Sequence, residues 1–437
     1  MQITHRPVAF STVQTKNDFP GVYQLAHICQ LDMDGTVGIS LNIRRSMPNG
    51  AYDIEIGSDL AIVRDAELRH ADSFQPLARA RVATHTDGKT YLLLSYPVVI
   101  GFAARGAQLA DGSPHPHAGT GFGYAHISGV PCTPDGAILG TGVIKREESA
   151  GIGLVELSQY SYDGKEFRIE STELFDYADF IRGDWTFCGA GLSNPISDGA
   201  DGFFCGMVAK PTGSPLPPRA GLARWKREDG KWQVVSFVPV APYGSYESSV
   251  VRDRDGSLLM TVRGCHEYLF PDSPEAMADV PNMNDIRVWR STDNGLNWTL
   301  VCYEKELRCC STVAIGITPH GQPFIVSHPY CTRDHMGRQI NVDAHSDWMR
   351  ESLALWPLSD DRSTVKGQII AKAPLDEFPP PTYGGTWWID HPQFANVVLS
   401  DGKLHTTFAC RVLEFNEAMG RKPPTPYTGA YIEEITD

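Results

Sequence analysis

The sequence lacks several features that would assign it to common protein classes. Its ten cysteines include no C-x-x-C pair and no zinc-like spacing, so we expect free, mostly buried thiols. No apolar run approaches the roughly 18 residues of a membrane-spanning helix, and the first residues show no basic-plus-apolar signal. We therefore expect no membrane partner and a cytoplasmic protein, or a periplasmic or secreted one if a leader is removed.

Positive charge is also scarce, because 38 Lys and Arg face 52 Asp and Glu, a net charge of −14. Phosphate contacts need a concentrated Lys/Arg surface, which we do not find, so we expect no nucleic-acid partner. No long helical period is visible either. Instead, 41 glycines and 31 prolines are spread along the chain, which is typical of many short strands and turns.

One unit recurs along the chain: an apolar strand, a turn of the Asp-Gly type and a second apolar strand. The seven turns are Asp34-Gly35, Asp87-Gly88, Asp135-Gly136, Asp201-Gly202, Asp255-Gly256, His320-Gly321 and Asp401-Gly402. Repetition at this scale predicts an all-β fold, a β-propeller with seven blades or alternatively six. No low-complexity linker divides the chain, so we expect a single domain over 1–437, closed by pairing of N-terminal and C-terminal strands.

Inner strands of a propeller bring side chains to the central axis, where ligands usually bind. Counting back about eight residues from each turn samples that axis. The positions reached are His27, Arg79, His126, Ser193, Glu247, Ser311, and His391 with Gln393. Histidines, an acid and an arginine gathered on one ring indicate a functional site.

Two motifs in the second half of the chain carry a resemblance to a known family. Residues 291–298 fit the Asp-box pattern S-x-D-x-G-x-x-W, a turn in which Ser291 and Asp293 bond the local backbone and Trp298 packs at the blade edge. Residues 247–263 fit E-x-S-V-V-x-x-x-D-G-x-L-L-x-x-x-R, which joins Glu247 to Arg263. The chain resembles the sialidase superfamily in these segments, with seven-bladed rhamnosidases and ulvan lyases closer in blade count.

The resemblance implies a site in which three arginines hold a substrate carboxylate, a Tyr is nucleophile and an Asp is acid/base. Arg263 matches the second arginine and Arg350 the third, whereas Gln24 stands at the place of the first. Asp53 falls in the stretch of the acid/base. The nucleophile position, within 390–394, holds no Tyr.

These residues predict an enzyme that cleaves a glycosidic bond next to an acidic sugar, a sialate or uronate in an oligosaccharide or polysaccharide substrate. In a hydrolase, Glu247 pairs with Asp53 or Asp390 as acid and base. The acidic protein then needs a local cationic pocket, for which the candidates are Arg263, Arg350, Arg333 and Arg79.

Two alternatives stay open. In a polysaccharide lyase, Arg263 and a histidine such as His27 or His391 neutralise a uronate carboxylate, while His126 or Tyr246 removes the C5 proton. In a non-catalytic propeller, the same rim only binds glycans. We expect no cofactor and no metal, although three histidines, His115, His117 and His126, lie close together in the sequence.

Overall fold

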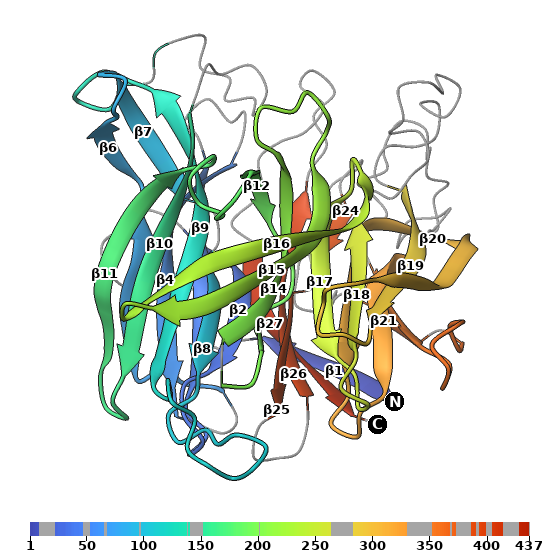
Figure 1. The fold of residues 1–437 in the computed structure, drawn as a ribbon. Helices are drawn as coiled ribbons and strands as arrows, with labels where there is room; N and C mark the ends of the chain where they lie inside the picture. The colour runs from blue at the N-terminus through green and yellow to red at the C-terminus, as the bar shows by residue number, and fades with distance from the viewer. Residues whose placement is uncertain are drawn as a thin grey trace.

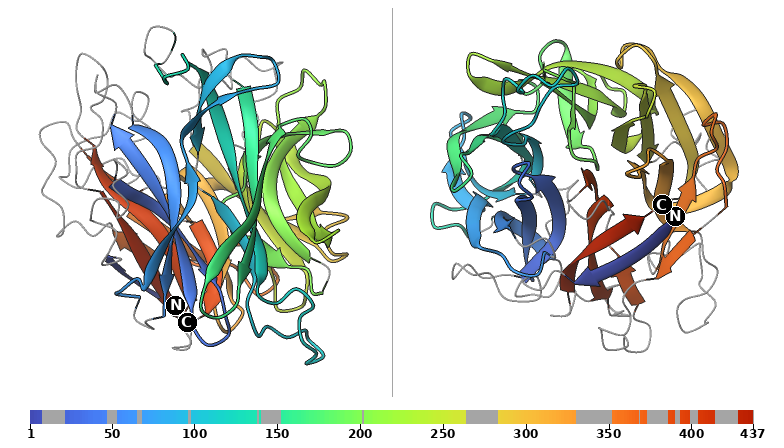
Figure 2. Two further views of the ribbon diagram at one scale, coloured as in Figure 1. Left: turned by 90° about the vertical axis from the view of Figure 1, so that its left-hand side faces the viewer. Right: turned by 90° about the horizontal axis from the view of Figure 1, so that it is seen from below.

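The computed structural model is built from β-strands arranged around a central axis (Figures 1 and 2). It describes residues 1–7, 22–46, 53–64, 68–95, 98–137, 139, 152–200, 202–263, 283–329, 352–367, 369–372, 386–389, 393–398, 404–413 and 428–436. Within these residues the strands form five sheets, and neighbouring strands in every sheet are antiparallel. The expected all-β propeller is confirmed.

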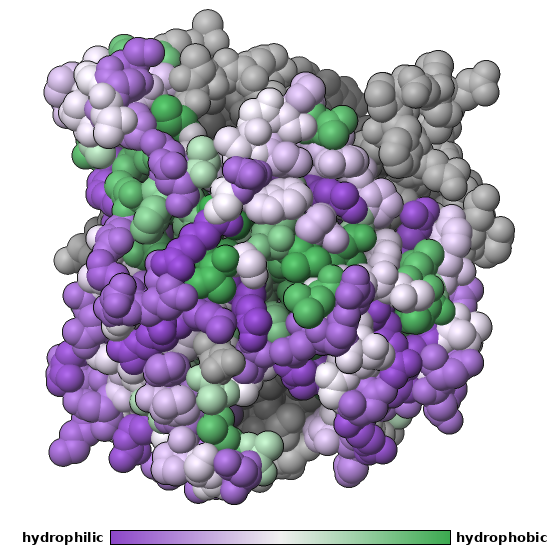
Figure 3. Space-filling view, in the orientation of Figure 1, coloured by the Kyte–Doolittle hydropathy of each residue, from purple (hydrophilic) through white to green (hydrophobic). Residues whose placement is uncertain are grey.

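The first sheet has the strand order β2-β3-β4-β5, and the second has β11-β10-β9-β7-β6 with β8 paired to β9. The strands of these two sheets are β2 (Val22–Gln30), β3 (Val37–Ser46), β4 (Asp53–Val63), β5 (Ser73–Arg79), β6 (Arg81–Thr84), β7 (Thr90–Ser95), β8 (Val99–Ala103), β9 (Thr120–Pro131), β10 (Ile152–Tyr162) and β11 (Phe167–Asp176). Strand β11 alternates between exposed and half-buried side chains, as a terminal strand does, and mostly hydrophilic residues cover this side of the molecule (Figure 3).

The third sheet has the order β12-β14-β15-β16 with β13 paired to β14, and the fourth runs from β17 to β23 in chain order. Their strands are β12 (Trp185–Ala190), β13 (Ile196–Ser197), β14 (Gly202–Pro211), β15 (Arg219–Glu228), β16 (Lys231–Tyr243), β17 (Tyr246–Arg252), β18 (Leu258–Arg263), β19 (Met283–Ser291), β20 (Thr299–Ile317), β21 (Pro323–Pro329), β22 (Ser352–Pro357) and β23 (Ile369–Lys372).

The fifth sheet joins the two ends of the chain. Its strands are β1 (Gln2–Pro7), β24 (Thr386–Ile389), β25 (Gln393–Val398), β26 (Leu404–Leu413) and β27 (Thr428–Thr436). β1 pairs with β27, which pairs with β26, so the first and last described strands lie side by side (Figure 2). That the whole chain is one domain stays a prediction.

The prediction of seven blades, with six as the alternative, is wrong, because the described strands form five sheets. The turns at Asp87-Gly88 and Asp135-Gly136 both belong to the second sheet. The turns at Asp255-Gly256 and His320-Gly321 both belong to the fourth, since the long β20 pairs with β19 near its start and with β21 near its end. A turn motif marks a hairpin and not the border of a sheet, so two pairs of sequence units merge.

Apolar side chains pack between neighbouring sheets. One cluster joins Leu60 and Ile62 of β4 to Ala125 of β9 and Tyr160 of β10. Another joins aromatic residues of the second and third sheets, where the rings of Phe122 and Trp225 stack 3.9 Å apart. These contacts fix the angle between sheets and hence the positions of the strand ends that carry polar groups.

The turn at residues 291–298 makes the local hydrogen bonds expected of it. The Ser291 hydroxyl donates to Asp293 Oδ1 at 2.8 Å and accepts from the Gly295 amide at 2.9 Å. Asp293 Oδ1 also accepts from the Asn297 amide, and the Trp298 indole donates to the Gly295 carbonyl. These donors lower the pKa of Asp293 to about 2, the Asn297 amide contributing most.

Candidate functional site

The structure brings Glu247 and Arg263 together at one end of the β17–β18 hairpin. Arg263 Nη1 donates to Glu247 Oε2 at 2.8 Å. The Glu247 side chain is 30% exposed and that of Arg263 17%, so solvent reaches the ion pair. A partly exposed carboxylate beside a fixed guanidinium is able to bind a polar ligand or exchange a proton with it.

A β-bulge gives Glu247 its position. Tyr246 pairs with Arg263 and Ser248 with Val262, so Glu247 is the extra residue between two register pairs. Such an insertion re-aims a side chain at the edge of a sheet. The hairpin itself is held by buried apolar side chains, those of Val250, Val251, Leu258, Leu259, Met260 and Val262.

Tyr246 is the exposed neighbour of this ion pair. Its side chain is 45% exposed, and its cross-strand partner is Arg263. Directly opposed residues of an antiparallel pair have Cβ atoms about 5 Å apart. A phenol, a carboxylate and a guanidinium therefore share one end of the hairpin.

His27 lies in β2 with 3% of its surface exposed, and neither ring nitrogen has a hydrogen-bond partner among the described residues. Burial lowers the pKa of His27 from 6.5 to about 4, against a smaller raising effect of the Asn194 side chain. Asn194 itself donates to the Ile28 carbonyl at 2.6 Å. The imidazole is thus neutral at physiological pH and enclosed by protein.

Arg79, which the count along the sequence places near the axis, makes its contacts within the first sheet. Arg79 ends β5, the last strand of the first sheet, and its guanidinium pairs with the fully buried Asp59. It also donates to the carbonyls of Ser58 and Ala78, while the Tyr23 hydroxyl donates to the other Asp59 oxygen at 2.6 Å. The charge of Arg79 is therefore already neutralised inside the protein.

The remaining predicted residues are distributed as follows. His126 is half-buried in β9, opposite Val155, and so belongs to a different sheet from Glu247. Gln24 in β2 and Asp53 at the start of β4 lie at the same end of the first sheet, and their side chains are outside the described ones. His391, Arg333 and Arg350 lie outside the described residues.

The histidine-rich loop uses its side chains for protein contacts. His115 Nε2 donates to the Gly199 carbonyl at 3.0 Å, and His115 Nδ1 accepts from the His117 amide at 3.1 Å. The rings of His117 and Trp232 are nearly perpendicular, with their centroids 5.2 Å apart. In the part of the chain that the structure describes, no three His, Cys, Asp or Glu side chains are placed to hold a metal.

Sequence reasoning missed a second polar cluster, which joins β6 and β10 of the second sheet. Arg81 Nη2 contacts Glu156 Oε2 at 2.5 Å, and the Glu156 side chain is only 6% exposed. The available signal was a lone acid at an inward position of the apolar segment 152–160. It also missed the turn at 359–364, where Ser359, Asp361 and Thr364 bond one another much as Ser291, Asp293 and Gly295 do.

Within the described residues, we find no helix with the length and apolar character needed to cross a membrane. The cytoplasmic location stays a prediction.

No protein-family model matches the chain, and no curated protein matches it. Among solved structures, it is similar to a GH93 α-L-arabinofuranosidase of Fusarium graminearum (9% identity, 94% of this chain and 92% of that chain, TM-score 0.48). It is also similar to a Penicillium chrysogenum α-L-arabinanase (8% identity, 99% and 98%, TM-score 0.44) and a Lactobacillus brevis α-L-arabinofuranosidase (12% identity, 81% and 97%, TM-score 0.36). Similarity at this level assigns no activity to the chain.

Proposed function

We propose that the protein is a carbohydrate-active enzyme, a propeller glycoside hydrolase of the sialidase type, that cleaves a bond next to an acidic sugar at the Glu247 end of the β17–β18 hairpin. One observation supports this most directly. Glu247 is held by Arg263 at 2.8 Å and yet stays 30% exposed. A carboxylate that serves only to stabilise a hairpin has no need of a bulge that turns it toward solvent.

In this proposal Glu247 acts in its ionised form, because the adjacent guanidinium favours the negative charge. An ionised carboxylate suits the base or nucleophile of a glycosidase, so a second carboxyl group supplies the acid. Asp53 and Asp390 are the proposed candidates. The separation of the two carboxyl groups decides between retention and inversion.

Arg263 is proposed to recognise the acidic sugar as well as Glu247. A guanidinium carries five N–H donors in a fixed fork, so one arginine is able to serve two carboxylates. Arg333, Arg350 and Gln24 are proposed to complete the carboxylate contact. We leave His27 and Arg79 out of the reacting set, because His27 is enclosed by protein and Arg79 is paired with Asp59.

β-Elimination is the second candidate reaction, and the exposed Tyr246 opposite Arg263 favours it. In that reaction Arg263 neutralises a uronate carboxylate, which acidifies the C5 proton. Tyr246 or His126 takes that proton and protonates the glycosidic oxygen as the C4–O bond breaks. The product then carries a C4–C5 double bond, which absorbs ultraviolet light, whereas hydrolysis creates no such bond.

The test is to incubate the protein with sialosides, rhamnosyl-glucuronates and neutral arabinosides while following released reducing sugar and ultraviolet absorbance. Reducing sugar from an acidic substrate without absorbance supports hydrolysis, and both signals together show elimination. Cleavage of the neutral arabinosides alone contradicts the acidic-sugar proposal. If neither signal appears with any substrate, the proposal of an enzyme is contradicted and glycan binding is the alternative.

The residue assignment is tested by Glu247→Gln, which keeps the shape of the side chain and removes its charge. We expect turnover to fall by about 100-fold or more, as for loss of a general base, with thermal unfolding little changed. Glu228→Gln is the matched control, because Glu228 is 39% exposed and pairs with Arg182 at 2.6 Å away from the hairpin. If Glu247→Gln retains full turnover, or loses stability with activity per folded molecule unchanged, Glu247 is structural.

A further inference from the structure

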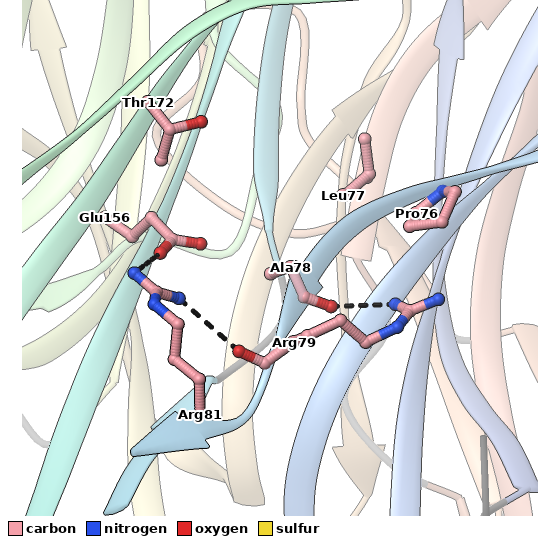
Figure 4. Close-up of a pocket in the computed structure, with 7 residues that line it drawn as sticks. All are labelled: Pro76, Leu77, Ala78, Arg79, Arg81, Glu156 and Thr172. Atoms are coloured by element: carbon pink, nitrogen blue, oxygen red, sulfur yellow. Dashed lines mark hydrogen bonds and ion pairs between the residues drawn. The ribbon is translucent and has the colours of Figure 1, made fainter. Parts of the chain in front are cut away.

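A groove with a volume of about 390 Å³ lies between the first two sheets (Figure 4). One wall is the end of β5, from Pro76 to Arg79, and the other wall carries Glu156 of β10 and Thr172 of β11. Arg81 at the start of β6 completes the lining. Its size falls within the range of about 300 to 1,000 Å³ that is usual for small-molecule sites.

The charges in this groove balance one another. Arg81 pairs with Glu156 at 2.5 Å and also donates to the Arg79 carbonyl at 3.4 Å. The Arg79 guanidinium points away from the pair toward the first sheet, where it meets Asp59 (Figure 4). An anionic ligand competes with Glu156 for Arg81, and a cationic ligand competes with Arg81 for Glu156. The first competition leaves the 6%-exposed Glu156 carboxylate unpaired, which is unfavourable, and in the second the cation has to replace the contacts of Arg81 with both Glu156 and the Arg79 carbonyl.

A neutral ligand with several hydroxyl groups meets neither difficulty. One hydroxyl accepts from Arg81 while its neighbour donates to Glu156, so the ion pair stays intact. Pro76, Leu77 and Ala78 supply an apolar surface on which the C–H face of a sugar ring packs. The exposed Thr172 adds a hydroxyl at the mouth of the groove.

A second, independent observation comes from the buried layer behind the groove. The Tyr160 hydroxyl lies near Glu156 and Ser158, is buried, and makes no hydrogen bond of good geometry in the described part of the chain. Ser58, the cross-strand neighbour of Ala78, and Asn42, the neighbour of Ser58, are also buried without side-chain partners there. Buried polar groups in this number usually have partners, and a hydroxylated ligand or the water it carries provides donors and acceptors together.

We propose that this groove binds a neutral sugar ring, at a site separate from the one around Glu247. The lining favours it on three counts: a charge-balanced Arg81–Glu156 pair, an apolar strip on β5 and a layer of unpaired hydroxyl and amide groups behind them. The site stands on these residues alone and does not depend on the proposed glycosidase activity.

The test titrates D-glucose and, as a charged counterpart of the same ring, D-glucuronate into the protein, with binding followed by NMR of the sugar protons. Thr172→Trp blocks the mouth from an exposed position of a terminal strand, so folding is retained. Glu170→Trp is the matched control, since Glu170 is exposed two residues along β11 and does not line the groove. Only binding that Thr172→Trp weakens is assigned to the groove.

We expect D-glucose binding that Thr172→Trp weakens about tenfold or more, which is a loss of one order of magnitude in Kd, and that Glu170→Trp and Glu247→Gln leave unchanged. Glucuronate binding, if the Glu247 site provides it, is insensitive to Thr172→Trp. The proposal is overturned if D-glucose does not bind, if Thr172→Trp binds it as the unmodified protein does, or if glucuronate shows equally strong binding that Thr172→Trp removes.

Discussion

Burial separates the polar residues of this protein into groups that meet solvent directly and groups that are enclosed by protein. Glu247 and Tyr246 reach solvent at the end of one hairpin, whereas His27 is enclosed. Protonation of a buried imidazole that has no hydrogen-bond partner is unfavourable, because the charge is then buried unpaired. Residues that the sequence offers equally as site candidates thus lie at different depths, and only the three-dimensional structure gives the depth.

The first prediction concerns the pH dependence of stability through His27. Its pKa is about 4 in the folded chain and 6.5 in a solvated one. As pH falls from 6.5 toward 4, the unfolded chain binds the proton first, so the free energy of unfolding decreases. The difference corresponds to a loss of about 3 kcal/mol, complete below the folded pKa.

Urea unfolding of the protein and of His27→Gln at several pH values between about 7 and 4 measures this contribution. The variant is expected to lose less stability over that interval, because its residue 27 does not titrate. Carboxylates and other histidines act equally on both proteins and cancel in the comparison. Parallel curves for the two proteins would show that His27 contributes nothing.

At the level of hairpins and turns, hydrogen bonds and ion pairs join elements that are distant in the sequence. Gly295 shows how closely one such turn packs. Its φ of +87° lies in the left-handed region, and an added Cβ would come within 2.3 Å of Leu222 Cδ2 in the third sheet. Leu222 is 2% exposed, so its side chain moves aside only by displacing its core neighbours.

The second prediction is that Gly295→Ala destabilises more than Gly230→Ala. Gly230 also has a positive φ, +79°, but no atom lies within 4 Å of its added Cβ. We expect a loss of about 1 kcal/mol for Gly230→Ala from the backbone alone and about 2 to 4 kcal/mol for Gly295→Ala from backbone and overpacking. Chemical denaturation measures both, and equal losses would mean that the turn moves freely away from Leu222.

The third prediction concerns an ion pair that joins two turns of the fourth sheet. Arg362 Nε and Nη2 each donate to an Asp253 oxygen at 2.8 Å, and the side chains are 14% and 2% exposed. Arg362→Met leaves the Asp253 carboxylate buried and unpaired, so we expect a loss of about 3 kcal/mol in the free energy of unfolding.

Lys366→Met is the control for that change, because Lys366 pairs with the exposed Asp360 in the same region. We expect no measurable loss there, since exposed ion pairs contribute little. Equal stability of the two variants in chemical denaturation would refute a linking role for Arg362.

At the scale of the whole molecule, closure of the ring depends on the two ends of the chain. Strand β1 pairs with β27 over six register positions, from Gln2 opposite Thr436 to Pro7 opposite Tyr431. Without β1, β27 becomes an unpaired edge with free backbone donors and acceptors. Closure therefore protects the fifth sheet as well as joining it to the rest of the chain.

The fourth prediction is that replacing residues 2–7 with a Gly/Ser segment of equal length lowers the thermal unfolding midpoint and promotes aggregation. The replacement keeps chain length but weakens strand formation, since glycine and serine are poor strand formers. Calorimetry and light scattering measure the two effects. An unchanged midpoint would show that β1 contributes little to stability.

How far the sequence alone determined this protein follows from the range of the interactions. Alternating apolar segments and Asp-Gly turns indicate hairpins, and the pairing of Glu247 with Arg263 could be predicted because both residues belong to one hairpin. The turn around Asp293 is likewise local, since its partners lie within four residues. Short loops and strand alternation dictate such contacts before any tertiary packing forms.

Tertiary structure alone decided the number of sheets, the burial of His27 and the cluster around Glu156. β20 joins two expected units because its single long strand has partners on both sides, and no turn motif records that choice. Arg81 meets Glu156, and Arg362 meets Asp253, across long stretches of chain. Hydrogen-bond register between distant strands depends on packing of whole sheets, which no local pattern of residues specifies.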